Sequence, residues 1–170
     1  MNLIIRKMTL DDLPAVVELD RTSFSLPWPE RSFRFELTDN PASRCWVVEV
    51  DGKLVGMIVV WLLVDEAHVA TLATHPDFRR QGIAKKLLSH ALQNLVKEGA
   101  QSSFLEVRVS NMAAQEMYRK FGYKESGRRR RYYKDNDEDA ILMSLDSLNA
   151  EHLMSYDGRS TIDKEEQNER

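Results

Sequence analysis

Hydrophobic residues recur at helical or strand spacing along most of residues 1–146. An amphipathic helix is predicted from Ile83 to Gly99, with the apolar stripe Ile83, Leu87, Leu88, Ala91, Leu92, Leu95 and Val96. The apolar run Ala67 to Thr74 before it is typical of a buried strand. Between the two lies the basic, glycine-containing segment 79–84, Arg-Arg-Gln-Gly-Ile-Ala. We take this strand, turn and helix as the unit around which the rest of the chain is organised.

The residues before this unit predict two helices and three strands. The expected elements are a strand at Leu3–Arg6, a helix from the N-cap Thr9 to about Arg21, a helix from Pro29 to about Thr38, and strands at 45–50 and 54–64. Asp51-Gly52-Lys53 between the last two strands predicts a tight hairpin.

The residues after the unit continue the alternation of strands and helices. A strand at Ser103–Val109, a helix capped by Asn111, a strand from Gly122-Tyr123 and a closing strand at Ala140–Leu145 are expected. Residues 147–170 are polar and acidic without a long apolar stripe, so we expect a tail there, disordered beyond Leu153. The pattern predicts one α/β domain over residues 1–146, with a mixed, mainly antiparallel sheet of about seven strands and about four helices.

Length and charge narrow the class of protein. At 170 residues the chain is long enough for one domain with a sizeable core. Its formal net charge is −3, and residues 1–146 hold 21 acidic and 21 basic side chains. A neutral body argues against non-specific binding of duplex nucleic acid, which requires a net basic footprint.

Cysteine and histidine usage excludes several kinds of site. Cys45 is the single cysteine, so an internal disulfide or a cysteine zinc site is impossible and a reducing compartment is expected. His68 and His75 lie seven residues apart without a carboxylate pattern, so we expect no metal, with His75 at a strand end and His68 solvent-facing or packed. The first residues lack a signal-peptide core, and the apolar run Met57–Val64 is too short to span a bilayer, so a cytoplasmic protein is expected.

The glycine segment has the features of an anion site. A glycine at the start of a helix lets a ligand approach the backbone, and the first amide NH groups of the helix have no internal partner. The helix dipole and the basic side chains Arg79, Arg80, Lys85 and Lys86 add positive potential there, which suits a pyrophosphate. The alternative is an ordinary loop entering a helix, because the P-loop pattern and the three glycines of the dinucleotide fingerprint are both absent.

Several segments together resemble a known family. Residues 79–84 look like the Q/R-x-x-G-x-G/A acyl-CoA loop of the GNAT N-acetyltransferase superfamily, with Ala84 at the second small position. Phe104–Asn111 and Met117–Tyr123 are similar to the second half of that fold. With Pro27-Trp28, Arg131-Tyr132-Tyr133 and Asp139-Ala140, they resemble the RimI-type protein N-terminal acetyltransferases over about residues 3–146.

The resemblance implies acetyl-CoA as the acetyl donor. Its site is expected where the fourth and fifth strands part, with the backbone of the fourth strand pairing with the pantetheine arm. A backbone NH of the same strand could stabilise the thioester oxygen. The residues implied to hold the donor are Leu72, Ala73, Thr74, Arg79, Arg80, Gln81, Gly82, Ile83, Ala84, Lys85 and Asn111, although Asn111 could simply cap its helix.

Two residues match the catalytic groups of the family. Alternation places Glu106 and Arg108 on one face of the fifth strand, so Glu106 either pairs with Arg108 or faces a cleft. The resemblance implies that Glu106 is the general base. Tyr118 lies at core spacing on its helix, and the resemblance makes it the general acid. Cys45 has no histidine close in sequence, which argues against a covalent cysteine route.

The residues expected to bind the acceptor have the largest number of alternative interpretations. Trp28 is expected to pack its loop onto the core and, by resemblance, to wall the entry of the acceptor. The resemblance also assigns Arg131, Tyr132, Tyr133 and Glu138 to the peptide groove. The basic run Arg128–Arg131 could instead bind RNA, although a solvated strand suits a neutral body better.

The function implied by the resemblance is direct acetylation of a protein N-terminus, of the ribosomal-protein-alanine type. A monomer or weak dimer is expected, with no membrane or direct nucleic-acid partner. A lysine or polyamine acceptor stays open because of the acidic run Asp135–Asp139. A CoA sensor without turnover is the third possibility.

Overall fold

The computed structural model describes residues 2–156, and these form one layered α/β domain. The strands are β1 (Leu3–Lys7), β2 (Ser43–Val50), β3 (Lys53–Leu63), β4 (Glu66–Thr74), β5 (Ser102–Arg108), β6 (Lys124–Tyr133) and β7 (Glu138–Leu145). The helices are α1 (Leu13–Ser23), α2 (Glu30–Thr38), α3 (Ile83–Lys97), α4 (Met112–Phe121) and α5 (Ala150–Met154), with short 3-10 turns at Leu10–Asp12 and Pro76–Phe78.

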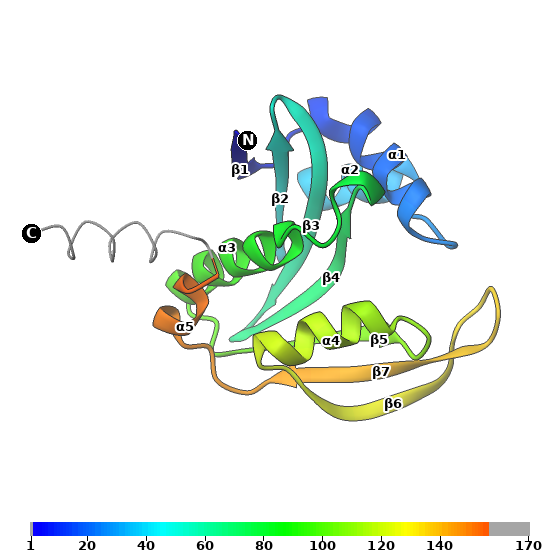
Figure 1. Ribbon diagram of the computed structural model, residues 1–170, viewed down its shortest axis with the longest axis vertical. Helices are drawn as coiled ribbons and strands as arrows, with labels where there is room; N and C mark the ends of the chain where they lie inside the picture. The colour runs from blue at the N-terminus through cyan, green and yellow to red at the C-terminus, as the bar shows by residue number, and fades with distance from the viewer. Residues whose placement is uncertain (1, 157–170) are drawn as a thin grey trace, which may run out of the picture.

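The seven strands form one mixed sheet, as the hydrophobic pattern predicted. Their order is β1-β2-β3-β4-β5-β7-β6, and every neighbouring pair is antiparallel except β4 and β5. The helices α1 and α2 cover one face and α3 and α4 the other (Figure 1). The predicted α/β sheet with four longer helices is therefore confirmed.

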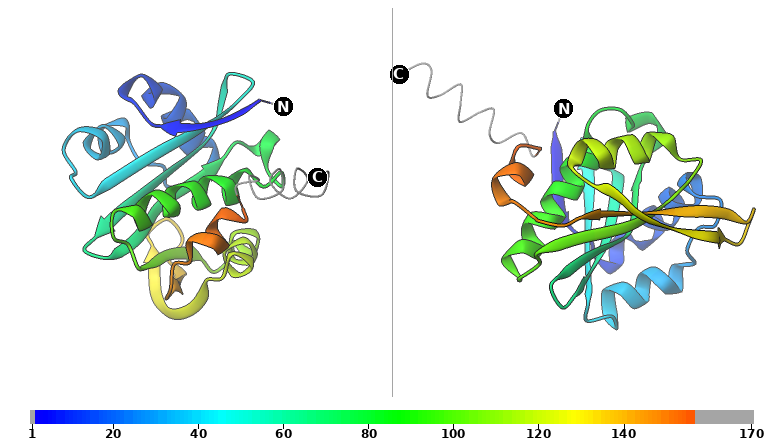
Figure 2. Two further views of the ribbon diagram at one scale, coloured as in Figure 1. Left: turned by 90° about the vertical axis from the view of Figure 1, so that its left-hand side faces the viewer. Right: turned by 90° about the horizontal axis from the view of Figure 1, so that it is seen from below.

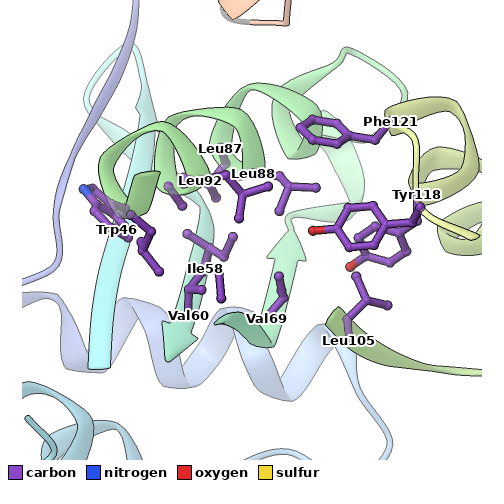
Figure 3. Close-up of a cluster of buried hydrophobic side chains, with 14 of the residues drawn as sticks. Trp46, Ile58, Val60, Val69, Leu87, Leu88, Leu92, Leu105, Tyr118 and Phe121 are labelled. Carbon is purple, nitrogen blue, oxygen red and sulfur yellow. The ribbon is translucent and has the colours of Figure 1, made fainter. Parts of the chain in front are cut away.

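Two apolar layers hold the helices on the sheet. One cluster joins α3 and α4 to β3, β4 and β5 through side chains such as Leu88, Leu92, Ile58, Leu105 and Phe121, all at most 1% exposed (Figure 3). A second cluster on the other face joins α1 and α2 to the sheet through Val16, Phe33, Met57 and Val59, all fully buried. The site must therefore lie at an edge of these layers or in a gap of the sheet.

Such a gap opens between β4 and β5. Their parallel ladder runs only from Glu66↔Ser102 to Val69↔Leu105, after which no further pairs form. The register of β4 against β3 shifts at the same level, because Val60 pairs with Val69 whereas Val59 pairs with Thr71. This bulge leaves Ala70 outside the ladder and turns the end of β4 away from β5. The prediction that these two strands part is confirmed.

The predicted hairpin between β2 and β3 also forms. Asp51 (φ 49°) and Gly52 (φ 83°) make a two-residue turn with both residues at positive φ, the conformation that matches the twist of paired strands. The first helix differs in detail, since Thr9 precedes the 3-10 turn Leu10–Asp12 and α1 starts only at Leu13.

The domain extends beyond the expected boundary at residue 146. The five-residue helix α5 lies against α3 (Figure 2), with Leu153 1% exposed and its carbonyl accepting a hydrogen bond from Ser89 Oγ. Tyr156 stacks on Phe121 with ring centroids 4.4 Å apart. Residues 147–156 are thus part of the packed domain, a correction to the expected tail. The expected disorder of residues 157–170 lies outside the described residues.

Candidate active site

A cleft of about 210 Å³ lies where β4 and β5 separate. It is lined from β4 by residues 69–72, from β5 by residues 105–108, from α4 by Ala114 and Tyr118, and from the α1–α2 connection by Phe24, Leu26 and Trp28. Six residues singled out from the sequence line it together: Trp28, Leu72, Glu106, Asn111, Tyr118 and Tyr133. The fold therefore brings both expected catalytic groups into one cleft.

Glu106 faces the cleft from β5 and is paired with a histidine. Its Oε2 lies 2.7 Å from His68 Nε2, and its Oε1 lies 4.0 Å from Arg129 Nε. Burial raises the pKa of Glu106, but the hydrogen bond and charge of His68 and the Arg129 guanidinium outweigh it and hold the pKa below its usual range. The carboxylate is ionised at neutral pH, as a general base requires.

The alternative pairing of Glu106 with Arg108 is wrong. Arg108 turns instead to the β6–β7 hairpin, with Asp135 at 3.1 Å and Glu138 at 3.4 Å, and its guanidinium lies 3.9 Å from the centre of the Tyr133 ring. Its Nη2 also donates to Ser25 Oγ at 3.2 Å. Arg108 therefore ties the α1–α2 connection to the hairpin across one side of the cleft.

The acidic run of this hairpin is occupied by these internal contacts. Asp135 accepts from both Ser25 and Arg108, which hold the pKa of its carboxyl below the usual range. Glu138 accepts from the backbone NH of Ser110 at 2.7 Å, which lowers its pKa as well. Asp139 accepts from the backbone NH of Arg131. Asp135 and Glu138 thus share one cation, Arg108, and three carboxylates of this run are held by contacts within the fold.

Tyr118 reaches the cleft from α4 on the other side of the sheet gap. The Tyr118 side chain (Figure 3) is 8% exposed. Its ring meets that of Tyr123 edge-on, with centroids 5.6 Å apart. Burial raises the pKa of its phenol, so the hydroxyl stays protonated at neutral pH. Within residues 2–156 the hydroxyl has no hydrogen-bond partner, which leaves it available to a group bound in the cleft.

The glycine segment adopts the conformation that an anion site needs. Gly82 has φ 76° and precedes the first residue of α3, and Arg80 also has a positive φ of 62°. The first helical bond runs from Lys86 N to Gly82 O, which leaves the NH groups of Ile83, Ala84 and Lys85 without helical partners. Ile83 itself is buried, whereas Ala84 and Lys85 are half-buried.

The basic side chains of this segment take different roles. Arg79 donates from Nε to the carbonyl of Thr74 at 3.1 Å and so braces the end of β4 against the turn. Arg80 and Gln81 are exposed, and Gln81 donates to Asp77 O. These residues do not line the cleft; they follow the C-terminal end of β4, the strand whose residues 69–72 do line it.

The end of β4 carries an unsatisfied polar group. Thr74 is 9% exposed, and its Oγ1 is the buried side-chain atom within residues 2–156 that has no hydrogen-bond partner. Ala73 before it is buried and Leu72 is half-buried in the cleft wall. Since a buried hydroxyl without a partner costs about 1–3 kcal/mol, this position fits contact with a bound polar group.

The remaining expected site residues have mainly structural contacts. Asn111 Oδ1 accepts from Ala114 N at 3.1 Å, so its side chain caps α4 while it also lines the cleft. Trp28 packs on Phe33 with ring centroids 5.2 Å apart and also lines the cleft, so both expected roles are compatible. Arg131 and Tyr132 are exposed in a bulge of β6 outside the cleft lining.

Sequence reasoning missed two polar residues of the site. His68 was expected to be solvent-facing or packed; it is packed, but it also binds Glu106. Asp20, 1% exposed in the cleft wall, accepts from Trp28 N at 2.6 Å and fixes the α1–α2 connection. Its helical spacing with Val16 and Leu19 was the signal, because it puts a carboxylate on the buried face of α1.

Other candidate chemistries find no support in the described residues. Residues 2–156 contain no group of three His, Cys, Asp or Glu side chains placed to hold a metal ion. Burial raises the pKa of the Cys45 thiol to about 11, so it is not a thiolate at neutral pH. His75 follows β4 and accepts from Asp77 N. In the described part of the chain, helices long and apolar enough to cross a membrane are absent.

Comparison with known proteins agrees with this site. Residues 13–123 match the Acetyltransferase (GNAT) family. An Escherichia coli K12 ribosomal protein bS18-alanine N-acetyltransferase is 34% identical over 152 residues, covering 83% of this chain and 95% of the relative. A Bacillus subtilis protein provisionally given the same name is 40% identical over 139 residues, covering 82% and 92%.

Solved structures show the same architecture. The crystal structure of the E. coli ribosomal-protein-S18-alanine N-acetyltransferase superposes with a TM-score of 0.78 at 32% identity, covering 87% of this chain and 96% of that one. Ard1 from Thermoplasma volcanium gives a TM-score of 0.80 at 26% identity, covering 88% and 100%. The fold and these matches together define an acetyltransferase. The chain belongs to the GNAT acetyltransferase family.

Proposed function

We propose that this chain transfers the acetyl group of acetyl-CoA to the N-terminal α-amino group of a protein. The observation that carries the proposal is the meeting of Glu106 and Tyr118 in one cleft, at the gap between β4 and β5. The names of the relatives support a ribosomal protein as the acceptor, and such an acceptor implies a cytoplasmic enzyme. We expect a monomer or weak dimer.

The described residues fit the donor at three places. The NH groups at the start of α3 suit its pyrophosphate. The edge of β4 beyond Val69 is unpaired on the side of β5, which suits the pantetheine arm. The buried Thr74 Oγ1 lacks a hydrogen-bond partner within residues 2–156, so it could bond to the donor. When bound, acetyl-CoA supplies an acetyl group activated as a thioester. The remaining chemistry falls to the residues of the cleft.

In the proposed mechanism the two residues move protons in opposite directions. Glu106 takes a proton from the α-ammonium of the acceptor, directly or through a water molecule. The free amine then attacks the acetyl carbon, so that a C–N bond forms and the C–S bond breaks. Tyr118 gives its proton to the departing thiolate, and the newly acetylated nitrogen loses its second proton to the resulting Tyr118 phenolate. A backbone NH of the splayed end of β4 would stabilise the carbonyl oxygen in the transition state.

The acid–base properties favour an α-amine over a lysine side chain. An α-amine has a pKa of about 7.7–8.0 against about 10.4 for lysine, so freeing it at pH 7 costs roughly 3 kcal/mol less. The lowered pKa of Glu106 makes it a weak base. Pairing of both Asp135 and Glu138 with Arg108 also weakens the expected attraction of this hairpin for a polyamine.

A turnover assay tests the proposed acceptor. Acetyl-CoA is offered with short peptides whose N-termini are free or blocked, with internal-lysine peptides and with spermidine, and the released thiol is measured. Only free N-termini should be acetylated. Transfer to lysine or spermidine alone would contradict the proposed α-amine acceptor, and binding of CoA with no turnover would indicate a sensor.

A steep salt dependence of RNA binding would support a role of Arg128–Arg131 in RNA contact.

A matched pair of glycine variants tests the donor site. Gly82 and Gly52 have φ 76° and 83°, and a Cβ at either position meets no atom within 4 Å. Both Gly82→Ala and Gly52→Ala should lose about 1–2 kcal/mol of unfolding free energy through backbone strain. Only Gly82→Ala should raise the KM for acetyl-CoA, by about tenfold, a change worth about 1.4 kcal/mol. Equal KM values in the two variants would contradict the assignment.

A further inference from the structure

His68 is a polar side chain of the cleft region to which no role has yet been given. We infer that His68 is a positioning residue that holds the carboxylate of Glu106 and leaves its Oε1 to the acceptor amine. The inference rests on the proposed role of Glu106 as general base. It is carried by the 2.7 Å contact between His68 Nε2 and Glu106 Oε2, within side chains that are only 15% and 12% exposed.

The sheet register fixes this contact. Trp61, His68 and Phe104 are direct cross-strand neighbours on β3, β4 and β5. The His68 ring stacks on Phe104 with centroids 4.3 Å apart and planes 9° apart, and it meets Trp61 edge-on at 5.2 Å. Glu106 is two residues beyond Phe104 and so points to the same face. The imidazole is therefore held at one position and one tilt beside the carboxylate.

The arrangement extends to α2. Trp61 Nε1 donates to Glu36 Oε2 at 2.9 Å, and Asn40 Nδ2 donates to the same oxygen at 2.9 Å. Because Glu36 fixes Trp61, and Trp61 fixes the edge of His68, the histidine cannot rotate without breaking packing and a hydrogen bond. A residue that merely filled space would not need its nitrogen directed at a carboxylate.

The contact assigns different tasks to the two oxygens of Glu106. Oε2 accepts from His68, which requires the proton of the imidazole to be on Nε2. Oε1 has Arg129 Nε at 4.0 Å, and the Glu106 side chain that carries it lines the cleft. The charged and titratable groups facing Glu106 are thus His68 from β4 and Arg129 and Tyr133 from β6, with Glu36 of α2 acting on His68 through Trp61.

This environment determines how activity should depend on pH. Burial alone would raise the pKa of Glu106, and the hydrogen bond of His68 is the largest opposing effect. Removing that donor should let burial dominate, so the carboxyl would become protonated at higher pH. A protonated Glu106 cannot act as a base. The acid limb, which is the fall of kcat/KM at low pH, should therefore move to higher pH.

The test compares three variants between pH 5 and 9 with a free-N-terminus peptide. His68→Phe keeps an aromatic ring on Phe104 but has no donor, and we expect its acid limb to rise by about one pH unit. Its kcat should fall by up to about tenfold on the acid limb and recover at higher pH, while the KM for acetyl-CoA stays unchanged. His68→Gln retains an NH donor, so its acid limb should lie close to that of the wild-type protein. Phe104→Leu removes the stacking partner that holds the imidazole, so it should move the limb in the same direction as His68→Phe but by less.

Several outcomes would overturn the inference. A wild-type pH profile in His68→Phe, with Glu106→Gln still inactive, would refute it and leave the proposed function intact. A Glu106→Gln variant of normal activity would remove the base itself and the inference with it. If His68→Phe does not fold, nitrogen-15 NMR of the histidines in the wild-type protein decides. A His68 ring that carries a proton on Nε2 supports the inference, and one protonated on Nδ1 alone overturns it.

Discussion

Replacing Glu106 by glutamine should lower kcat by about 10²- to 10⁴-fold at pH 6, the usual contribution of a general base. The loss should shrink as the pH rises toward 9, because an α-amine with a pKa of about 8 then loses its proton without help. Since the Glu106 carboxyl has a pKa below its usual range, the wild-type enzyme keeps its base over this whole interval. The ratio of wild-type to variant kcat is therefore largest at low pH.

The measurement is kcat against pH for both proteins with one peptide acceptor. Glu49→Gln serves as the control, because it makes the same carboxyl-to-amide change on β2, where Glu49 pairs with Arg6. It should leave the profile unchanged. Parallel profiles for wild type and Glu106→Gln would mean that Glu106 does not take the proton.

Replacing Tyr118 by phenylalanine should give the second largest effect, a loss of about 10²-fold or more in kcat. Burial raises the pKa of Tyr118, so the phenol is protonated at every pH between 6 and 9. The loss should therefore be nearly constant over this range, in contrast to that of Glu106→Gln. Single-turnover kinetics, which separate chemistry from product release, provide the readout.

Tyr123 offers a matched control for this variant. It is equally buried and touches Tyr118, but its hydroxyl bonds to Ser103 Oγ at 2.7 Å. Tyr123→Phe should lower stability by about 1–3 kcal/mol through the lost hydrogen bond and leave kcat near the wild-type value. Equal losses of kcat in the two variants would assign Tyr118 a packing role instead.

Local pattern was sufficient for most of the fold. The apolar stripe of α3 is buried along one face of the helix, and the apolar runs of β2 and β3 are buried on both faces of the sheet, so these patterns indicated the core directly. Gly82 and Asn111 marked the starts of α3 and α4 because both positions have strong backbone or capping requirements. The short helix α5 was not predicted, because five residues with one buried leucine show no hydrophobic periodicity.

The site was less accessible to sequence reasoning, because its contacts join distant residues. His68 and Glu106 are 38 positions apart, and only the parallel register of β4 and β5 makes them neighbours. Arg108 has partners up to 83 positions away in the sequence. From the sequence alone, Glu106 on the same strand was the expected partner. The bulges in β4 and β6 likewise depend on pairing that no single strand encodes. Glu106 and Tyr118 were found through resemblance, not periodicity.

The short ladder between β4 and β5 has a consequence for cooperativity. Within residues 2–156, four ladder pairs join the β1–β4 half of the sheet to the half formed by β5, β6 and β7. A donor lying in the gap would contact both halves where backbone hydrogen bonds are missing. Its binding free energy would then add to the free energy of unfolding. The bound molecule would in effect serve as an eighth strand, one that makes two half-sheets unfold together.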